Sequence, residues 1–159
     1  MRILKLNSNN IDEAVMLLQR VFPDDKEDCR KAFESSLDIR SNPDWIRKYK
    51  IKNIEYWVMM KDDEVIGTVG LYNETSDPEK LVWLGWYCVK KSYRGQGIGK
   101  RLFIFARNKA KKRGNKILRL YTSPKNKIAN KMYDNIGFKV VKVIGSNTKD
   151  ILFHKEIRI

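Results

Sequence analysis

Three alternating glycines separate an apolar run from an amphipathic helical pattern, and this junction constrains the fold more than any other feature of the chain. Val82–Val89 has the composition of a buried strand, a basic turn follows, and apolar residues from Ile98 onward recur at helical spacing. The first N–H groups of a helix lack partners and carry the positive end of the helix dipole. The junction therefore predicts a phosphate- or pyrophosphate-binding turn, in which side chains are absent at Gly95, Gly97 and Gly99.

Two better-known glycine-rich phosphate loops do not match this turn. A Walker A loop requires a Lys followed by Ser or Thr, whereas Lys100 precedes Arg101. A dinucleotide fingerprint requires a third glycine three positions after the second, and Lys100 stands there instead. Because the remaining pattern is short, an ordinary strand-to-helix turn without a ligand is the alternative interpretation of these residues alone.

The pattern that remains, Arg94-x-x-Gly97-x-Gly99, is similar to the Arg/Gln-x-x-Gly-x-Gly/Ala acyl-CoA loop of the GNAT superfamily of N-acyltransferases. A second segment, residues 126–138 (NKIANKMYDNIGF), resembles the Asn-x-x-Ala-x-x-Leu-Tyr-x-x-x-Gly-Phe segment of that family, with Met132 where Leu is usual. The resemblance covers nearly the whole chain and is strongest over residues 82–138. It implies an acyl-CoA-dependent N-acetyltransferase that uses acetyl-CoA as co-substrate and needs no metal.

The order of the apolar patterns, β-α-α-β-β-β-α-β-α-β-β, is the one that GNAT proteins show, so the predicted fold class is α/β, with a central twisted mixed sheet flanked by helices. The resemblance further implies that the fourth and fifth strands splay apart and that a β-bulge interrupts the fourth strand near Val89. Residues 41–53 are expected to be a connecting segment and residues 145–147 a turn. Strands are expected at residues 1–6, 55–60, 64–72, 81–89, 116–122, 138–144 and 151–159, and helices at 11–22, 24–37, 98–113 and 125–136.

Length and composition predict one globular domain. The chain has 159 residues, of which 42% are hydrophobic and 33% charged, and a single N-acetyltransferase domain is expected over residues 1–159. No stretch approaches the ~20 apolar residues of a membrane span, and the N-terminal residues lack the apolar region of a signal peptide. Cys29 and Cys88 have no metal-type spacing, and His154 has no partner pattern. We therefore expect a cytoplasmic protein with reduced thiols, no structural metal and no membrane partner.

The positive charge is concentrated in one part of the sequence. The net charge is +14; residues 90–142 hold 17 Lys or Arg against the single acid Asp134, which gives +16, and the remaining residues give −2. Coenzyme A carries a pyrophosphate and a 3′-phosphate, so a basic field around the glycine turn would concentrate it. Nucleic-acid binding is the rival interpretation, although no recognised nucleic-acid motif accompanies the charge. For Lys109, Lys111, Lys112 and Arg113, a solvated helix end is the preferred interpretation.

The resemblance also implies roles for residues at matching positions. The backbones of Tyr87 and Val89 would contact the pantetheine arm and the acyl carbonyl, and their side chains would matter little. Asn126 would contact the coenzyme from the last helix, and it also fits as the N-cap of that helix. Tyr133 would be the general acid that protonates the departing thiolate, with simple packing against Phe138 as the alternative. The pyrophosphate would be bound by the turn formed by Arg94, Gly95, Gln96, Gly97, Ile98, Gly99 and Lys100.

A general base is missing from the expected fourth strand. Many family members carry a carboxylate or His there, but residues 82–89 contain neither. Glu74, on the loop expected before that strand, is the candidate base, and a chain of water molecules is the alternative. Cys88 has no His or Asp/Asn orienter near it in the sequence, which argues against an acyl-enzyme. The predicted reaction is direct attack of a primary amine on acetyl-CoA in a ternary complex.

In the family, the first two helices help to shape the acceptor pocket. Their junction here, Pro23–Asp28, contains four acidic residues, which either attract a cationic amine or complement a helix dipole. A small-molecule amine is favoured over a protein acceptor, and a homodimer stays open. The alternative to an enzyme is a non-catalytic CoA-binding sensor or a nucleic-acid-binding module that uses residues 90–142. Five aromatic residues either line the acceptor pocket or belong to half-buried strands: Trp45, Tyr49, Trp57, Trp83 and Trp86.

Overall fold

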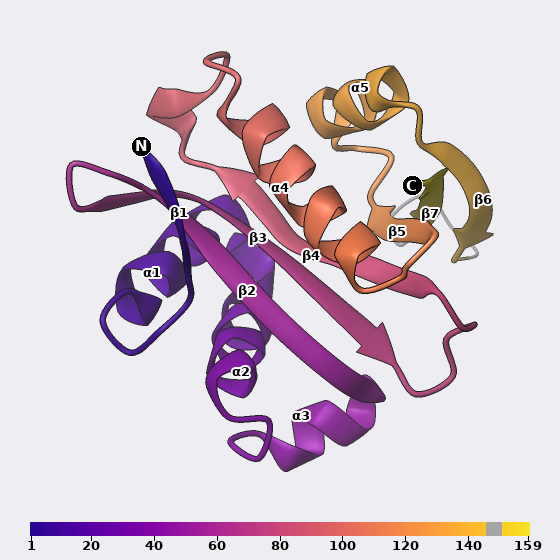
Figure 1. The fold of residues 1–159 in the computed structure, drawn as a ribbon, viewed down its shortest axis with the longest axis horizontal. Helices are drawn as coiled ribbons and strands as arrows, with labels where there is room; N and C mark the ends of the chain where they lie inside the picture. The colour runs from indigo at the N-terminus through magenta and orange to yellow at the C-terminus, as the bar shows by residue number, and fades with distance from the viewer. Residues whose placement is uncertain (146–150) are drawn as a thin grey trace.

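The structure, a computed structural model, describes residues 1–145 and 151–159 and contains a seven-stranded sheet in the order β1-β2-β3-β4-β5-β7-β6 (Figure 1). Neighbouring strands are antiparallel except β4 and β5, which run parallel. The strands are β1 (Arg2–Lys5), β2 (Ile51–Lys61), β3 (Glu64–Glu74), β4 (Leu81–Val89), β5 (Ile117–Thr122), β6 (Lys139–Ile144) and β7 (Leu152–Arg158).

Helices cover both faces of this sheet, and the predicted α/β fold with a mixed sheet is confirmed. The helices α1 (Ile11–Val21) and α2 (Lys26–Leu37) pack against β2 and β3 on one face, and α4 (Ile98–Lys112) packs on the other (Figure 1). The last helix, α5 (Lys127–Ile136), shares the α4 side of the core. No helix within the described residues is long and apolar enough to cross a membrane.

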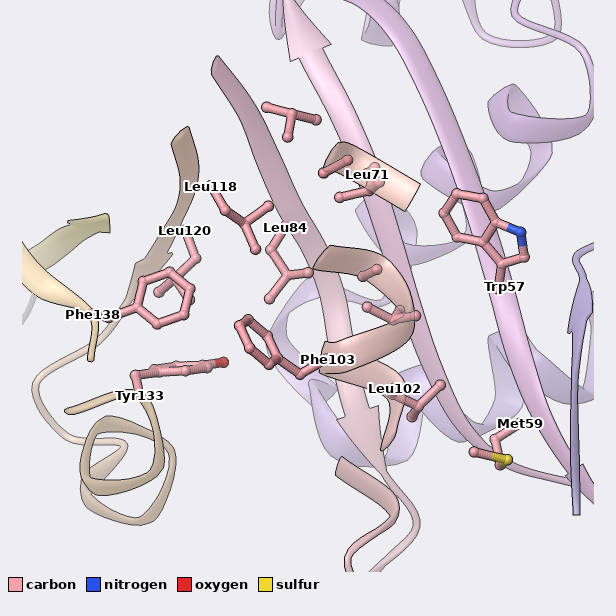
Figure 2. Close-up of a cluster of buried hydrophobic side chains, with 14 of the residues drawn as sticks. Trp57, Met59, Leu71, Leu84, Leu102, Phe103, Leu118, Leu120, Tyr133 and Phe138 are labelled. Carbon is pink, nitrogen blue, oxygen red and sulfur yellow. The ribbon is translucent and has the colours of Figure 1, made fainter. Parts of the chain in front are cut away.

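Two separate hydrophobic clusters fill the space between helices and sheet. The cluster on the α4 side includes Leu84, Leu102 and Phe103, and Tyr133 and Phe138 close it from the α5 end (Figure 2). The cluster on the α1 and α2 side includes Leu18, Phe33 and Tyr56, each at most 1% exposed. The sheet therefore has two different buried faces, and α5 is attached to the core through its aromatic residue Tyr133.

Three predicted elements need correction. Part of the segment expected to be irregular, residues 41–53, forms the short helix α3 (Pro43–Lys48), because Pro43 fits the first turn of a helix and Trp45 anchors it in the core at 9% exposure. Strand β2 also begins at Ile51, four residues before the predicted start. The helix expected over 24–37 begins only at Lys26, because residues 24 and 25 belong to a 3-10 turn, η1 (Pro23–Asp25). Residues 146 and 147 of the predicted turn lie outside the described residues.

The splay implied between the fourth and fifth strands is confirmed. Pairing of β4 with β5 is confined to the three positions from Leu81 to Trp83, opposite Ile117 to Arg119. Beyond this point, residues 84–89 of β4 and 120–122 of β5 have no pairing with each other. Backbone groups on both strands are consequently free to bind a ligand between them.

A β-bulge lies in β4, but earlier than expected. Thr68 pairs with Cys88 and Gly70 with Gly85, so Trp86 and Tyr87 together face the single residue between them on β3. Trp86 adopts the left-handed region with φ of 38°, which is unusual for a residue with a side chain. The bulge is therefore centred on Trp86 and Tyr87 rather than near Val89, and it turns the strand away from β5.

Candidate active site

The glycine turn lies between β4 and α4, after the 3-10 turn η2 (Lys91–Tyr93). Gly95 and Gly97 have φ of 78° and 76°, and Gly97 is the N-cap of α4. Glycine adopts such angles most readily because it has no Cβ, so the turn favours glycine at both positions. No atom lies within 4 Å of the Cβ positions that side chains would occupy there, which means that the outer surface of the turn is open.

Five consecutive backbone N–H groups in this turn are available to a ligand. The first hydrogen bond of α4 runs from the N–H of Arg101 to the carbonyl of Gly97 over 3.1 Å. The N–H groups of residues 96–100, by contrast, have no acceptor among the residues that the structure describes. Unpartnered N–H groups at a helix N-terminus suit the oxygens of a pyrophosphate, so the structure fits the binding role predicted for Gln96, Gly97, Ile98, Gly99 and Lys100.

Tyr87 uses its side chain, contrary to the expectation that only its backbone would matter. Its hydroxyl donates a 2.6 Å hydrogen bond to the carbonyl of Gly99 and lies 3.8 Å from the sulfur of Met132. A Cβ at position 99 would lie 3.0 Å from that hydroxyl oxygen. Gly99 therefore serves the packing of α4 against the bulge, while Gly95 and Gly97 serve the shape of the turn.

Arg94 and Val89, predicted to flank the coenzyme, are in contact with each other. The Nε of Arg94 donates a 3.0 Å hydrogen bond to the carbonyl of Val89. The Arg94 side chain is exposed, so its remaining guanidinium donors point into solvent around the turn. This contact fixes the guanidinium next to the last residue of β4, beside the open N–H groups.

Tyr133 projects inward from α5 beside the splay. Its ring is 8% exposed, and its centroid lies 6.4 Å from that of Tyr87 and 5.7 Å from that of Phe138. Figure 2 shows its hydroxyl directed away from α5 and toward Phe103. The hydroxyl has no hydrogen-bond partner within residues 1–145 and 151–159, and burial raises its pKa to about 12. Tyr133 therefore packs against Phe138 and also holds a proton that it can donate.

The start of α5 contains one predicted residue and one that the sequence did not indicate. The side-chain oxygen of Asn126 accepts a hydrogen bond of 3.4 Å from the N–H of Ala129, which confirms the N-cap. Asn130 donates to the carbonyl of Ser123 over 2.8 Å, but its buried side-chain oxygen has no partner in the part of the chain that the structure describes. Asn130 stands one turn before Tyr133. The sequence could not indicate this unpartnered oxygen, because Asn130 belongs to a helical pattern that reads as exposed.

Glu74 is not brought together with Tyr133. It is the last residue of β3 rather than part of a loop, and its N–H donates to the carboxylate of Asp77 over 2.6 Å. In the sheet, Glu74 lies beside the first residue of β4. That place is roughly 16 Å from the bulge along β4, because each strand residue spans about 3.3 Å. Burial and the charge of Asp77 raise its pKa. Glu74 lies on the face of the sheet that carries α1 and α2, at the far end of β4 from the glycine turn.

Both thiols are buried and protonated. Burial raises the pKa of Cys88 to about 11, and its sulfur lies 3.4 Å from the hydroxyl of Thr68. Burial and the nearby charge of Asp25 raise the pKa of Cys29 to about 12. A thiol with such a pKa is a poor nucleophile at neutral pH. Among the described residues, no three His, Cys, Asp or Glu side chains form a group that would hold a metal ion.

The acidic junction of the first two helices borders a groove of about 380 Å³. Asp28 accepts hydrogen bonds from the indole of Trp45 over 2.8 Å and from the hydroxyl of Tyr49 over 2.9 Å. This carboxylate therefore does more than complement a helix dipole. Partial burial, then Asp28 and Asp24, raise the pKa of Asp25, whose side chain has no hydrogen-bond or ion-pair partner within the described chain.

Aromatic side chains form the neighbouring part of this face. The ring of Trp83 stacks on Tyr72 with centroids 5.8 Å apart and contacts His154 at 5.0 Å and Tyr121 at 6.3 Å. Trp86, at the bulge, contacts Phe22 of the α1 end at 5.2 Å. Of the five aromatic residues predicted to line a pocket or a strand, Trp57 belongs to the opposite face, where it packs against α4.

Comparisons with known proteins agree with this geometry. The sequence model described as the Acetyltransferase (GNAT) family matches residues 18–138. The Xenopus tropicalis protein named "Probable N-acetyltransferase 14" is 36% identical over 93 residues, which are 58% of this chain and 44% of that protein. PaiA N-acetyltransferase from Thermoplasma acidophilum, solved in complex with coenzyme A, superposes with a TM-score of 0.75 at 21% identity, over 99% of this chain and 98% of that one.

A second relative, "Probable N-acetyltransferase camello" of Xenopus tropicalis, is 32% identical over 92 residues. The matched segment spans less than half the length of each relative, 44% of the first and 42% of the second. The similarity to the Thermoplasma structure establishes the fold. The family match covers most of the chain, including the glycine turn and the segment that carries Tyr133. The chain therefore belongs to the GNAT acetyltransferase family.

Proposed function

We propose that this chain is an N-acetyltransferase that transfers an acetyl group from acetyl-CoA to a primary amine by direct attack in a ternary complex. The observation that carries the proposal is the row of unpartnered N–H groups at residues 96–100, placed beside the gap between β4 and β5. A small-molecule amine is the favoured acceptor, because the α1 and α2 face contains a groove of about 380 Å³.

The residues of the turn would hold the anionic part of the donor. The N–H groups of residues 96–100 and the guanidinium of Arg94 would bind the pyrophosphate. The free edges of β4 and β5 would pair with the amides of the pantetheine arm, as Tyr87 and Val89 lie at the bulged end of β4. Asn126 and the orphaned oxygen of Asn130 border the same region from α5.

Acetyl-CoA supplies a thioester as the acyl donor. The neutral amine nitrogen forms a bond to the carbonyl carbon, the carbon–sulfur bond breaks, and the sulfur leaves with its electron pair. Tyr133 stabilises the departing sulfur by donating its hydroxyl proton. Because its pKa of about 12 lies above the ~8.5 of a free thiol, the tyrosinate is a strong base that regains a proton released by the nitrogen.

The amine must lose a proton before or during attack. Glu74 is the carboxylate predicted for this task, and at roughly 16 Å from the bulge it would act only through a chain of water molecules. The buried thiol of Cys88 supports direct attack over an acyl-enzyme, since its pKa of about 11 keeps it protonated at neutral pH.

Calorimetric titration with acetyl-CoA and with free CoA, at two salt concentrations, tests the proposal. We expect saturable binding of both, followed by amine-dependent release of thiol. CoA binding without thiol release across a broad amine panel would favour a sensor. Salt-sensitive binding of nucleic acid without CoA binding would favour the alternative use of the basic residues 90–142, and either result would reject the enzyme.

A further inference from the structure

We infer that His154 is the general base that takes the proton from the attacking amine nitrogen. This inference rests on the proposed acetyltransferase function and adds a catalytic residue to it. Three features carry it: the imidazole lies at the closed end of the gap between β4 and β5, it lies on a part of the sheet that no helix covers, and its nitrogens are open to water.

His154 belongs to β7, and its imidazole meets a side chain of β4. The centroid of the imidazole lies 5.0 Å from that of the Trp83 ring. Because β5 separates β7 from β4 in the sheet, the two side chains meet above β5. Trp83 is the last residue of β4 that pairs with β5. The imidazole therefore lies where the gap between these two strands closes.

Along the strands, His154 is level with the bulge in β4. Trp83 pairs with Arg119 in the parallel register, so Tyr121, two residues further along β5, is level with Gly85. Gly85 is the residue directly before the bulge. Tyr121 in turn pairs with His154 on the other side of β5. The register alone therefore brings His154 to the height of the bulge.

A bound donor would bring its thioester toward this height. Its pyrophosphate would lie at the N–H groups of residues 96–100, beyond the end of β4 where the gap is open. From there the pantetheine arm can extend only toward the closed end. Glu74, the other candidate base, lies beside the first residue of β4, four residues or roughly 13 Å farther along the strand than Gly85. His154 is therefore the nearer proton acceptor.

The imidazole faces the side of the sheet that carries α1 and α2. Leu118 and Leu120 belong to the cluster on the α4 side, so the alternate residues Arg119 and Tyr121, and with them His154, face the other side. In the described part of the chain, the cluster beneath α1 and α2 contains no residue of β5 or β7. The side chain of Tyr121 is 50% exposed. An amine can therefore reach this part of the sheet from solvent.

The imidazole is able to accept a proton. Neither nitrogen forms a hydrogen bond with a described residue, and neither belongs to the fully buried atoms without a partner, which are Nε of Arg107 and Oδ1 of Asn130. Both nitrogens are consequently open to water or to a ligand. Trp83, which the imidazole contacts, is uncharged, and its indole donates to Asp77 over 2.9 Å.

The charged groups around His154 keep the imidazole neutral. Partial burial, then Arg119 and Lys142, lower the pKa of His154 from its ordinary value of 6.5, and Glu156 opposes them. Arg119 is hydrogen-bonded to Glu156 over 2.6 Å, and Lys142 of β6 pairs with His154 in the sheet. The phenol of Tyr121, with a pKa raised to about 12, is also neutral. At pH 7 the imidazole is therefore in the form that a general base requires.

The proton transfer completes the proposed reaction. The neutral amine nitrogen bonds to the carbonyl carbon and becomes positively charged. An imidazole nitrogen of His154 accepts a proton from it, directly or through one bridging water, while the carbon–sulfur bond breaks and the sulfur takes the electron pair and the proton of Tyr133. The imidazolium then releases its proton to water, from which the tyrosinate regains one.

Proton NMR on the wild type gives a test that needs no amine. His154 is the single histidine of the chain, so its imidazole signal is assigned without variants. We expect the signal to titrate with an apparent pKa below 6.5 and to shift differently with saturating acetyl-CoA than with free CoA, because these ligands differ only at the sulfur. An identical signal without ligand, with CoA and with acetyl-CoA would overturn the inference.

His154→Gln provides the kinetic test, with the amine of the panel that reacts fastest. We expect kcat to fall by roughly a hundredfold or more, with KM for acetyl-CoA and the melting temperature unchanged. The ratio of the wild-type rate to the variant rate cancels the ionisation of the amine. This ratio should rise with pH through the pKa of His154 and then become constant. A residue that only packs against Trp83 would give a ratio independent of pH.

Lys142→Gln should move the rise of this ratio to higher pH, because the lysine charge lowers the pKa of His154. The rate comparison then uses Lys142→Gln with and without His154→Gln. Lys139→Gln is the matched control, since Lys139 is also exposed on β6 but pairs with Glu156. If acetyl-CoA binds and amines react while the ratio stays flat, the inference is wrong and the proposed function stands. If acetyl-CoA does not bind, the proposed function itself fails.

Discussion

Lys155 of β7 and Asp134 of α5 form an ion pair of 2.8 Å in which the lysine is buried and the carboxylate is not. The side chain of Lys155 is 3% exposed and that of Asp134 is 61% exposed. Asp134 is also the single acid within residues 90–142. Asp134 is adjacent to Tyr133 in the sequence. The ion pair therefore holds α5, the helix that carries the proposed proton donor, against the sheet.

Asp134→Asn is expected to destabilise the protein by about 2 kcal/mol or more, because it leaves the ammonium of Lys155 buried without a counter-charge. Chemical denaturation measures this loss. The double variant Asp134→Asn, Lys155→Met removes the buried charge as well and should recover most of the stability. Equal stability of the single variant and the wild type would contradict the role of the pair.

Gly97 is expected to respond differently to two substitutions. Asn tolerates the φ of 76°, whereas a β-branched Val does not. Gly97→Asn should therefore weaken acetyl-CoA binding with little change in melting temperature, and Gly97→Val should lower both. Gly114→Asn is the matched control, because Gly114 has φ of 82° and open space around it at the other end of α4. Unchanged affinity in both Gly97 variants would remove the turn from the binding site.

Tyr133→Phe should lower kcat by roughly tenfold to a hundredfold and leave KM for acetyl-CoA unchanged. The ring packing against Phe138 is retained, so stability should not change. With a pKa of about 12, Tyr133 stays protonated from pH 6 to pH 10, and the wild-type rate should rise across this range as the amine loses its proton, without a descending limb. A variant as fast as the wild type would refute proton donation by Tyr133.

Asp25→Asn should stabilise the protein at pH 7 and lose this advantage at acidic pH. Partial burial and the neighbouring acids Asp28 and Asp24 raise the folded-state pKa of Asp25 above its ordinary value of 3.8. The folded state thus favours the protonated form of Asp25. The stability that this form contributes is complete below pH 3.8 and is lost as the pH rises through the folded-state pKa. Melting curves at pH 7 and pH 3 measure the difference. A variant less stable than the wild type at pH 7 would contradict an unfavourable charge on Asp25 in the folded state.

The residues around the glycine turn could be predicted well, because their structure is locally determined. Strand β4 has the predicted bounds, Leu81–Val89, since a buried apolar run ends there at a basic turn. The N-cap of α5 follows from Asn126 and the short helical pattern after it. The helix that contains Trp45, in contrast, is not predictable, because six residues of helix are too few for a periodic pattern to appear.

Residues that act through long-range contacts were not predictable. Tyr56 has the pattern of an ordinary strand aromatic, and the position of its ring depends on two glycines of other strands, Gly70 and Gly85. In the sequence, Lys155 has the pattern of a solvated strand lysine. Only the packing of α5 places Asp134 next to it. Glu74 is expected on the loop before β4, whereas it is the last residue of β3, and the β3–β4 register places it at the end of β4 that is far from the bulge.

The early end of β4–β5 pairing after Trp83 would give the proposed enzyme two separate entrances. Tyr133 belongs to the hydrophobic cluster on the α4 side of the sheet, and the cluster on the other side is covered by α1 and α2. Donor and acceptor would meet through the sheet rather than side by side in one pocket. In the proposed reaction neither substrate would block the path of the other, both orders of binding would be open, and the thiol and the amide would leave by opposite faces.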